Sequence, residues 1–267
     1  MTGRAGEGAT AGDQFECAAR RLAGAHRVVV FTGAGVSKES GIATFREGED
    51  AVWNKYDAME MATMEGYLRD PSYVWAWYQY RFGLVEGCDP NPAHVAIAEM
   101  ERLVPELAVV TQNIDGLHQR GGSSTVLELH GSIRRFKCLH GRHGGFTREE
   151  VERQADRPPR CPECGELIRP DVVWFGEMLP EGVLQESFRL AQRCDVMLVV
   201  GTSGVVQPAA LLPHVARESH AFVIDVNPQR GESARAADVF LKGAAGEVLP
   251  RLVDGMREVA AQNGLPV

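Results

Sequence analysis

The sequence predicts an α/β protein in which helices cover both faces of a parallel sheet, with a smaller unit built from two insertions. Two observations lead to this prediction. Short apolar runs rich in valine recur along the chain, and stretches of helical character separate them. Two further stretches interrupt the alternation, and each has a composition of its own.

The apolar runs predict buried strands, because β-branched runs of this kind are typical of parallel sheets. The predicted strands are residues 28–31, 107–111, 196–201 and 222–226. Residues 91–104 and 207–218 are predicted helices between strands. The domain that holds this sheet is expected to comprise residues 15–46, 93–133 and 171–255.

The two interruptions differ in chemistry. Residues 47–92 are rich in Trp, Tyr and Met, which indicates a helical insertion. Residues 134–170 contain a cysteine pair, several histidines and little apolar content. So few hydrophobic residues cannot form a core of their own, and a bound metal is therefore predicted to hold this second insertion. The two ends, residues 1–14 and 256–267, are predicted to be tails.

The composition indicates a globular protein and argues against several other classes. An apolar fraction of 44% and a charged fraction of 24% are ordinary for a globular protein. The net charge of −8 argues against a nucleic-acid partner, and no apolar run approaches the ~20 residues that span a bilayer. Two of the six cysteines form the pair Cys161-Pro-Glu-Cys164, which suits a metal better than a secreted disulfide framework. We expect a cytoplasmic monomer that does not bind a membrane.

A glycine-rich turn directly follows the first predicted strand. Gly33, Gly35 and Gly41 would let backbone N–H groups approach a pyrophosphate closely. The spacing departs from G-x-G-x-x-G, and no acidic residue stands clearly at a strand end about 20 positions further on. A hydride-transferring dehydrogenase is therefore disfavoured.

Four sequence blocks together carry a family resemblance. They are GAGVSKESGIATFR at 33–46, TQNIDGLH at 111–118, ELHGSI at 128–133 and GTSGVVQPAA at 201–210. In order and spacing the chain resembles the sirtuins, which remove acyl groups from lysine by consuming NAD. The resemblance implies a Rossmann-like large domain and a small domain made of the two insertions. NAD and the acylated lysine of a protein or peptide would bind in the cleft between them.

His130 and Asn113 are the predicted catalytic residues. His130 follows the strand-like run 126–129, and a histidine titrates near neutral pH, so it can take a proton from a sugar hydroxyl. The alternative is a buried, hydrogen-bonded histidine without a catalytic role. The resemblance implies that His130 is the general base on the ribose of NAD. It also implies that nicotinamide and O-acyl-ADP-ribose are released together with the free lysine.

Polar residues beyond the ends of the predicted strands are the candidate NAD ligands, since open α/β sheets bind ligands there. Their alternative role is ordinary turn chemistry. The resemblance implies that Gln112 and Asn113 hold the nicotinamide ribose and that Asp115 binds the carboxamide. Phe45 is implied to shield the intermediate, or else only packs the loop. The predicted NAD-binding set, whose last three members serve the adenosine half, is Gly33, Ala34, Gly35, Ser37, Phe45, Arg46, Gln112, Asn113, Ile114, Asp115, Gly201, Thr202, Ser203, Asn227 and Ala245.

An apolar segment ending in glycine is the predicted peptide-binding strand. Its residues could simply form a core strand that joins the two domains. The resemblance implies instead that they pair with the substrate backbone as an added strand, which needs few side-chain contacts. These residues are Val173, Trp174, Phe175 and Gly176.

Three residues of the helical insertion predict the acyl group. Tyr78 and Arg81 are three positions apart and so share a face of a helix. They could merely belong to a packing helix from which Arg81 reaches water. The pattern, with Ala58 upstream, resembles the sirtuin branch that acts on succinyl- and malonyl-lysine. This implies that Tyr78 and Arg81 bind the distal carboxylate and that the small Ala58 makes room for it. We expect desuccinylase and demalonylase activity, with weaker deacetylase activity.

The structural zinc of the family uses two C-x-x-C pairs, of which this chain keeps one. Cys161 and Cys164 form the intact pair, whereas Cys138 lacks its cysteine partner. His143, or else the closer His140, could complete a Cys3His site. Zinc is predicted at Cys138, His143, Cys161 and Cys164. The alternative is a site that folds without metal.

Two other functions use the same NAD site. Protein ADP-ribosylation would leave ADP-ribose on a protein instead of releasing O-acyl-ADP-ribose. A non-catalytic NAD-binding regulator would need no general base, so the set Asn113, Asp115 and His130 argues against it.

Overall fold

The computed structural model describes residues 10–44 and 51–263. The helices are Ala11–Ala23 (α1), Val52–Lys55 (α2), Ala58–Met61 (α3), Met64–Arg69 (α4), Pro71–Glu86 (α5), Pro92–Met100 (α6), Leu117–Arg120 (α7), Arg148–Glu152 (α8), Glu181–Arg193 (α9), Leu212–Glu218 (α10) and Ala245–Gln262 (α11). The strands are Arg27–Thr32 (β1), Glu106–Thr111 (β2), Val126–Glu128 (β3), Gly131–Cys138 (β4), Gly144–Phe146 (β5), Ile168–Val172 (β6), Val196–Val200 (β7), Phe222–Asn227 (β8) and Val239–Lys242 (β9). Short 3₁₀ helices occupy Ala34–Ser40 (η1), Ala209–Leu211 (η2) and Glu232–Arg235 (η3).

The large sheet is parallel, with the strand order β3-β2-β1-β7-β8-β9. All four predicted strands belong to it, so the predicted α/β architecture is confirmed. From β1 the chain first proceeds to β2 and β3 on one side and later returns to β7 on the other. This reversal makes β1 the switch point of the sheet, where a crevice opens beyond the carboxyl ends of the strands.

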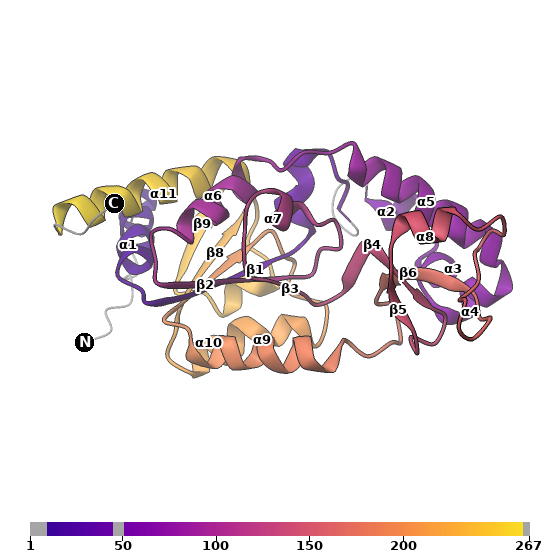
Figure 1. Cartoon of the computed structure of the whole chain (residues 1–267). Helices are drawn as coiled ribbons and strands as arrows, with labels where there is room; N and C mark the ends of the chain where they lie inside the picture. Colours follow the sequence, from indigo (N-terminus) through magenta and orange to yellow (C-terminus); the bar gives the residue numbers. More distant parts are fainter. Residues whose placement is uncertain (1–9, 45–50, 264–267) are drawn as a thin grey trace.

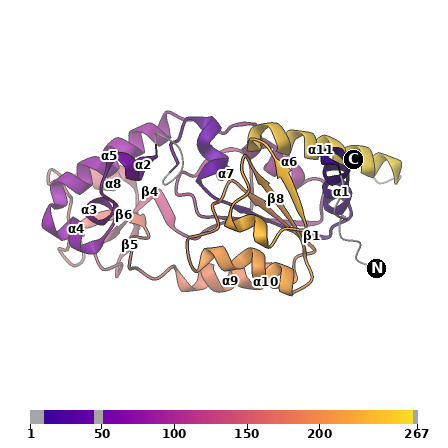
Figure 2. The ribbon, with the colours of Figure 1, turned by 180° about the vertical axis from the view of Figure 1, so that it is seen from behind.

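Helices cover both faces of this sheet (Figures 1 and 2). Helices α1, α6 and α11 lie on one face, and α9 and α10 lie on the other. Side chains of β1 alternate between the two cores: Val28 and Val30 face the first layer, whereas Val29 and Phe31 face the second. A strand between two helical layers must be apolar at successive positions, which is why runs of valine predicted these strands.

Both predicted tails overlap helices of the structure. Helix α1 already begins at Ala11, because Thr10 and Asp13 cap it reciprocally. Helix α11 continues to Gln262 and buries Met256 in the first core. The tail predictions are therefore wrong for residues 11–14 and 256–262.

None of the described helices combines the length and the apolar character needed to cross a membrane.

The two insertions form one smaller unit, at the end of the molecule away from α1 (Figure 1). Its antiparallel sheet has the order β5-β4-β6, with α2 to α5 and α8 around it. Trp77 and Tyr78 of α5, in the first insertion, share a core with Leu139 of the second insertion and with Val172 and Trp174 just beyond it. Because this core draws on both insertions, neither buries its apolar side chains alone.

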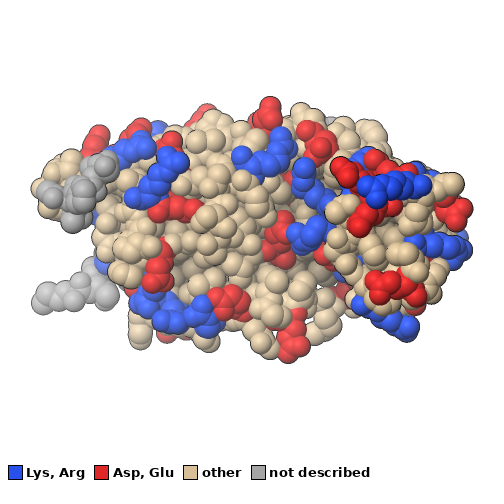
Figure 3. Space-filling model, in the orientation of Figure 1, with Lys and Arg blue, Asp and Glu red and all other residues tan. Residues whose placement is uncertain are grey.

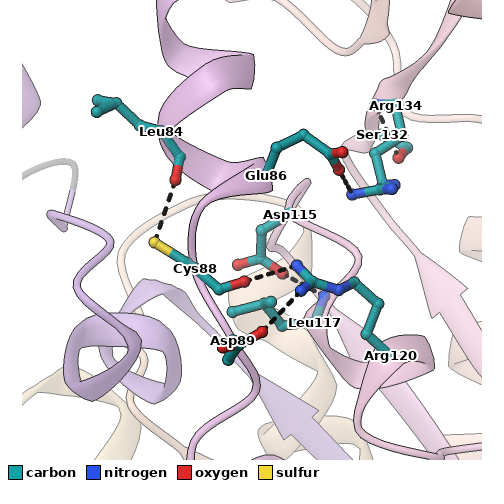
Figure 4. A network of polar contacts seen from close by, with 9 residues as sticks. All are labelled: Leu84, Glu86, Cys88, Asp89, Asp115, Leu117, Arg120, Ser132 and Arg134. Carbon is teal, nitrogen blue, oxygen red and sulfur yellow. Dashed lines mark hydrogen bonds and ion pairs between the residues drawn. The ribbon is translucent and has the colours of Figure 1, made fainter.

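Two arginines hold the connection that leads from α5 back to the large sheet (Figure 4). Arg120 of α7 donates to the carbonyl oxygen of Cys88 at 2.7 Å and to the carboxylate of Asp89 at 3.1 Å. Arg134 of β4 pairs with Glu86 at the end of α5. The connection is thus fixed by one residue from each unit.

Gly131, directly after His130, generates a prediction about stability. It has φ +74°, and a Cβ atom there would lie 2.0 Å from the carbonyl oxygen of Asp171 on β6. Gly145 has a similar φ of +78° but open space around it. Gly145→Ala should lower the free energy of unfolding by about 1–2 kcal/mol through backbone strain alone. Gly131→Ala should cost clearly more, because β4 and β6 must also separate.

Urea denaturation of the two variants and the wild type measures this difference. Equal losses in both variants would show that the close approach of β4 and β6 does not matter.

Candidate active site

One cavity lies beyond the carboxyl ends of three adjacent strands. Gly33 and Gly35 follow β1, Gln112 follows β2, and Gly201 and Thr202 follow β7, and all five line it. The cavity therefore sits at the switch point of the sheet, the place where open α/β sheets bind ligands. The opposite wall comes from the smaller unit.

The turns after β1 and β7 touch each other closely. The N–H of Gly35 donates to the carbonyl oxygen of Gly201 at 2.8 Å, and a Cβ atom on Gly35 would lie 2.7 Å from that oxygen. Gly201 itself has φ +60°. The predicted glycine turn is therefore required by packing, because side chains would force the two strand ends apart.

A chain of hydrogen bonds fixes the polar residues after β2. Gln112 donates from Nε2 to Thr202 Oγ1 at 2.8 Å, which joins the ends of β2 and β7. Asn113 donates from Nδ2 to Ser37 Oγ at 3.0 Å, and Ser37 donates to Asp115 Oδ2 at 2.8 Å. Gln112 and Asn113 line the cavity, whereas Ser37 and Asp115 stand behind Asn113. Burial raises the pKa of Asp115 despite these hydrogen bonds.

His130 faces the same cavity from the start of β4. Its Nδ1 atom lies 2.9 Å from the carbonyl oxygen of Gln112. Because a carbonyl only accepts, Nδ1 carries the proton and Nε2 presents a lone pair in the neutral ring. Burial lowers the pKa of His130, although the bond to Gln112 acts in the opposite direction. The imidazole is thus held as a neutral base at physiological pH.

The remaining predicted NAD ligands fall into three groups. Ala34, Ile114 and Ser203 line the cavity. Asn227 and Ala245 are buried outside the lining, and Asn227 contacts it through Thr202, whose carbonyl oxygen lies 3.4 Å from Asn227 Nδ2. Phe45 and Arg46 lie outside the described residues.

The far end of the cavity is aromatic and carries one cation. Trp77, Tyr78 and Arg81 of α5 line it, and the Arg81 guanidinium carbon lies 5.1 Å from the Trp77 ring centre. The Tyr78 hydroxyl accepts a hydrogen bond from Trp174 Nε1 at 2.8 Å. Burial raises the pKa of Tyr78 to about 12 and lowers the pKa of Arg81, which nevertheless stays charged.

The predicted peptide-binding segment forms a side of the cavity. Val173, Trp174, Phe175 and Gly176 all line it. The N–H of Val173 donates to the carbonyl oxygen of His130 at 2.9 Å, so this segment and the predicted base are tied together.

The structure does not bring Ala58 to the cavity; Ala62 lies there instead. The carbonyl oxygen of Ala62 accepts from the N–H of Phe175 at 2.8 Å, which places its small side chain against the cavity. The run WNKYDAMEMAT contains both alanines, four residues apart, and only the fold distinguishes them. Trp53 and Thr44 also line the cavity and were missed.

Four potential metal ligands of the second insertion converge. Cys138, His143, Cys161 and Cys164 place their ligand atoms within 4.8 Å of one another. His140 turns away, and its Nδ1 lies 3.0 Å from Glu166 Oε1. Three thiols and one imidazole at this spacing fit a tetrahedral structural zinc site, in which zinc would join the two ends of an insertion that has little core.

Comparison with known proteins agrees with this geometry. Residues 33–208 match the family model of the Sir2 family. The chain belongs to the Sir2 family. It is 48% identical over 242 residues to the NAD-dependent protein deacylase of Pyrococcus furiosus, covering 90% of this chain and 96% of that protein. It is 49% identical over 237 residues to NAD-dependent protein deacylase 1 of Pseudomonas aeruginosa, covering 87% and 95%.

Solved Sir2 structures share the fold. A Sir2 homologue in complex with NAD superposes with a TM-score of 0.82 at 43% identity, covering 91% of this chain and 94% of that one. Sir2Af2 bound to a myristoylated histone peptide gives a TM-score of 0.74 at 38% identity, covering 94% and 99%. NAD is thus the cofactor that the fold and the family indicate for this cavity.

The metal cluster of this Sir2 family member generates the second prediction. Protein purified with a reductant and without chelator should contain about one zinc per chain. Cys164→Ser should lower both the zinc content and the melting temperature, since metal binding stabilises the insertion. Cys88→Ser, a thiol outside the cluster, is the matched control and should keep its zinc.

Metal analysis and thermal unfolding with and without a chelator check this prediction. A zinc content under about half an equivalent would support the alternative of a site that folds without metal.

Proposed function

We propose that this NAD-dependent protein deacylase prefers lysines that carry a dicarboxylic acyl group, succinyl or malonyl, and acts less well on acetyl-lysine. One observation carries the proposal: Tyr78 and Arg81 line the same cavity as Asn113 and His130. A substrate that extends from the catalytic residues toward α5 therefore ends at a buried cation.

The residues around His130 are arranged for the transfer. NAD supplies the ribose that takes over the acyl group as nicotinamide leaves. Asn113, held by Ser37, and Gln112, held by Thr202, fix the nicotinamide end of the cavity, and aligned reactants allow the weak acyl oxygen to attack. His130 then takes the proton of the ribose hydroxyl at Nε2. One water molecule is consumed, and the products are lysine, nicotinamide and O-acyl-ADP-ribose.

The peptide would lie along the segment from Val173 to Gly176. Within this segment, the N–H of Val173 donates to the carbonyl oxygen of His130, and the N–H of Phe175 donates to that of Ala62. An extended peptide can add to it through its main chain, which makes selection depend on the acyl group more than on the flanking sequence.

The charge of Arg81 would make the cavity select acyl groups that carry a carboxylate. Arg81 is only 9% exposed, so a carboxylate that reaches it meets a cation largely removed from water. A charge-assisted hydrogen bond contributes about 1.5–3 kcal/mol, which corresponds to roughly 10- to 150-fold in discrimination. The Tyr78 hydroxyl accepts from Trp174, and its own proton can be donated to the same carboxylate.

A cytoplasmic monomer that acts without nucleic acid or a membrane is part of the proposal. None of the six cysteines forms a disulfide, which is typical of a reducing compartment. Acidic and basic side chains are interspersed over the face shown in Figure 3, and the net charge is −8.

Replacement of the buried cation tests the acyl preference. Arg81→Met should lower kcat/KM for a succinyl-lysine peptide about 10- to 150-fold and leave that for the acetyl-lysine peptide nearly unchanged. Tyr80→Phe is a control on the same helix, because Tyr80 is exposed and lies outside the cavity lining. Peptide mass after incubation with and without NAD measures both rates. Full desuccinylase activity in Arg81→Met would refute the carboxylate role.

The lowered pKa of His130 predicts the acidic limb of the pH profile. A base with a folded-state pKa below 6.5 is more than half deprotonated at pH 6.5, so kcat/KM should keep more than half of its plateau value there and fall steeply only at lower pH. His130→Ala should lose about 10²- to 10⁴-fold in activity, whereas the exposed His26→Ala should lose none. A profile that already declines between pH 8 and 7 would contradict a depressed pKa.

A further inference from the structure

The histidine of the metal cluster has a carboxylate on its outer side. His143 Nδ1 lies 3.5 Å from Cys161 Sγ and thus faces the other ligands. On the opposite side of the ring, Nε2 lies 3.4 Å from Glu163 Oε2. The ring is therefore placed between the metal cluster and an acidic side chain.

The backbone of His143 is fixed separately from its ring. Its N–H donates to Cys138 Sγ at 3.2 Å, and its carbonyl oxygen accepts from the N–H of Cys138 at 2.8 Å. These bonds hold the residue to the end of β4 but leave rotation of the side chain open. Glu163 comes from the other half of the cluster, between Cys161 and Cys164.

A ligating imidazole needs a defined tautomer. If Nδ1 gives its lone pair to the metal, Nε2 must carry the proton, and a carboxylate that accepts this proton fixes both the tautomer and the ring orientation. A thiolate ligand has no second nitrogen and needs no such partner. Replacing a cysteine by a histidine thus creates a requirement that Glu163 is placed to meet.

We propose that Glu163 is a positioning residue for zinc: it accepts the Nε2 proton of His143 and holds Nδ1 toward the metal. The inference rests on zinc binding by the cluster and is independent of the acyl preference. One loop, Cys161-Pro-Glu-Cys164, then supplies two thiolates and also the group that orients the histidine from the other half of the site.

The same insertion contains a second pair of this kind, which serves as a control. Glu166 Oε1 lies 3.0 Å from His140 Nδ1, but His140 is outside the metal cluster. Glu166 is three residues from Glu163 and is part of the same loop region. Its replacement removes the same charge and a comparable histidine contact without touching a ligand.

The test is a set of zinc affinities measured on the full chain at one pH, by competition with a chelator of known affinity. Glu163→Ala, which removes the acceptor, should weaken zinc binding about ten-fold, the lower end of the effect of such partners, because the Glu163 side chain is mostly exposed. Glu166→Ala should bind zinc as tightly as the wild type. His143→Cys should restore a four-thiolate site, and adding Glu163→Ala to this variant should change nothing.

Cobalt substitution provides a second readout that does not depend on activity. The thiolate-to-cobalt absorption should rise from the wild type to His143→Cys, since a fourth thiolate replaces the imidazole. Unchanged zinc affinity in Glu163→Ala would overturn the proposal. An equal loss in the His143→Cys background would do so as well, because the effect would then be one of charge and not of the histidine.

Discussion

The contact between the turns after β1 and β7 is the constraint on which the rest of the site depends. Gly35 and Gly201 approach so closely that neither can carry a side chain without displacing the other strand end. Their approach brings the end of β7 beside Gln112 and Asn113 of the β2 end. The hydrogen bonds through Ser37 and Asp115 then have one geometry, and His130, the proposed base, is fixed beside them by its hydrogen bond to the carbonyl oxygen of Gln112.

The second wall of the cavity depends on a shared core. Tyr78 lies on α5 in the first insertion and shares a core with Leu139 of the second, and its hydroxyl accepts a hydrogen bond from Trp174, which lies beyond β6. The end of the cavity at Tyr78 and Arg81 therefore depends on both insertions. A metal that holds the cysteine-containing insertion would stabilise this wall from a distance, because β4 runs from Gly131, directly after His130, to Cys138.

The large sheet and the position of the strand-end residues beside the cavity were predictable from sequence, whereas the lining at the α5 end of the cavity was predictable only in part. Buried parallel strands leave an uninterrupted apolar run, and strand-end residues such as Asn113 follow it directly. Ala58 and Ala62 look alike in sequence, and only the hydrogen bond from Phe175 to the residue after α3 shows which one lines the cavity.

The start of α1 depends on a cap residue. Thr10 caps the helix at Ala11, although the composition of this stretch is typical of a tail. For the fourth metal ligand, spacing left two histidines open, and the pairing of His140 with Glu166 decides between them.

Arg120, which holds the connection after α5, joins the two ends of the cavity through hydrogen bonds. Arg120 belongs to a helix of four residues, and the first N–H of that helix is bound by Asp115. The helix that carries Tyr78 and Arg81 is thus connected, through one guanidinium and one turn, to the carboxylate that supports Asn113. Under the proposed function, such a frame would hold Arg81 at a constant distance from His130, so that the length of the acyl chain would matter as well as its charge.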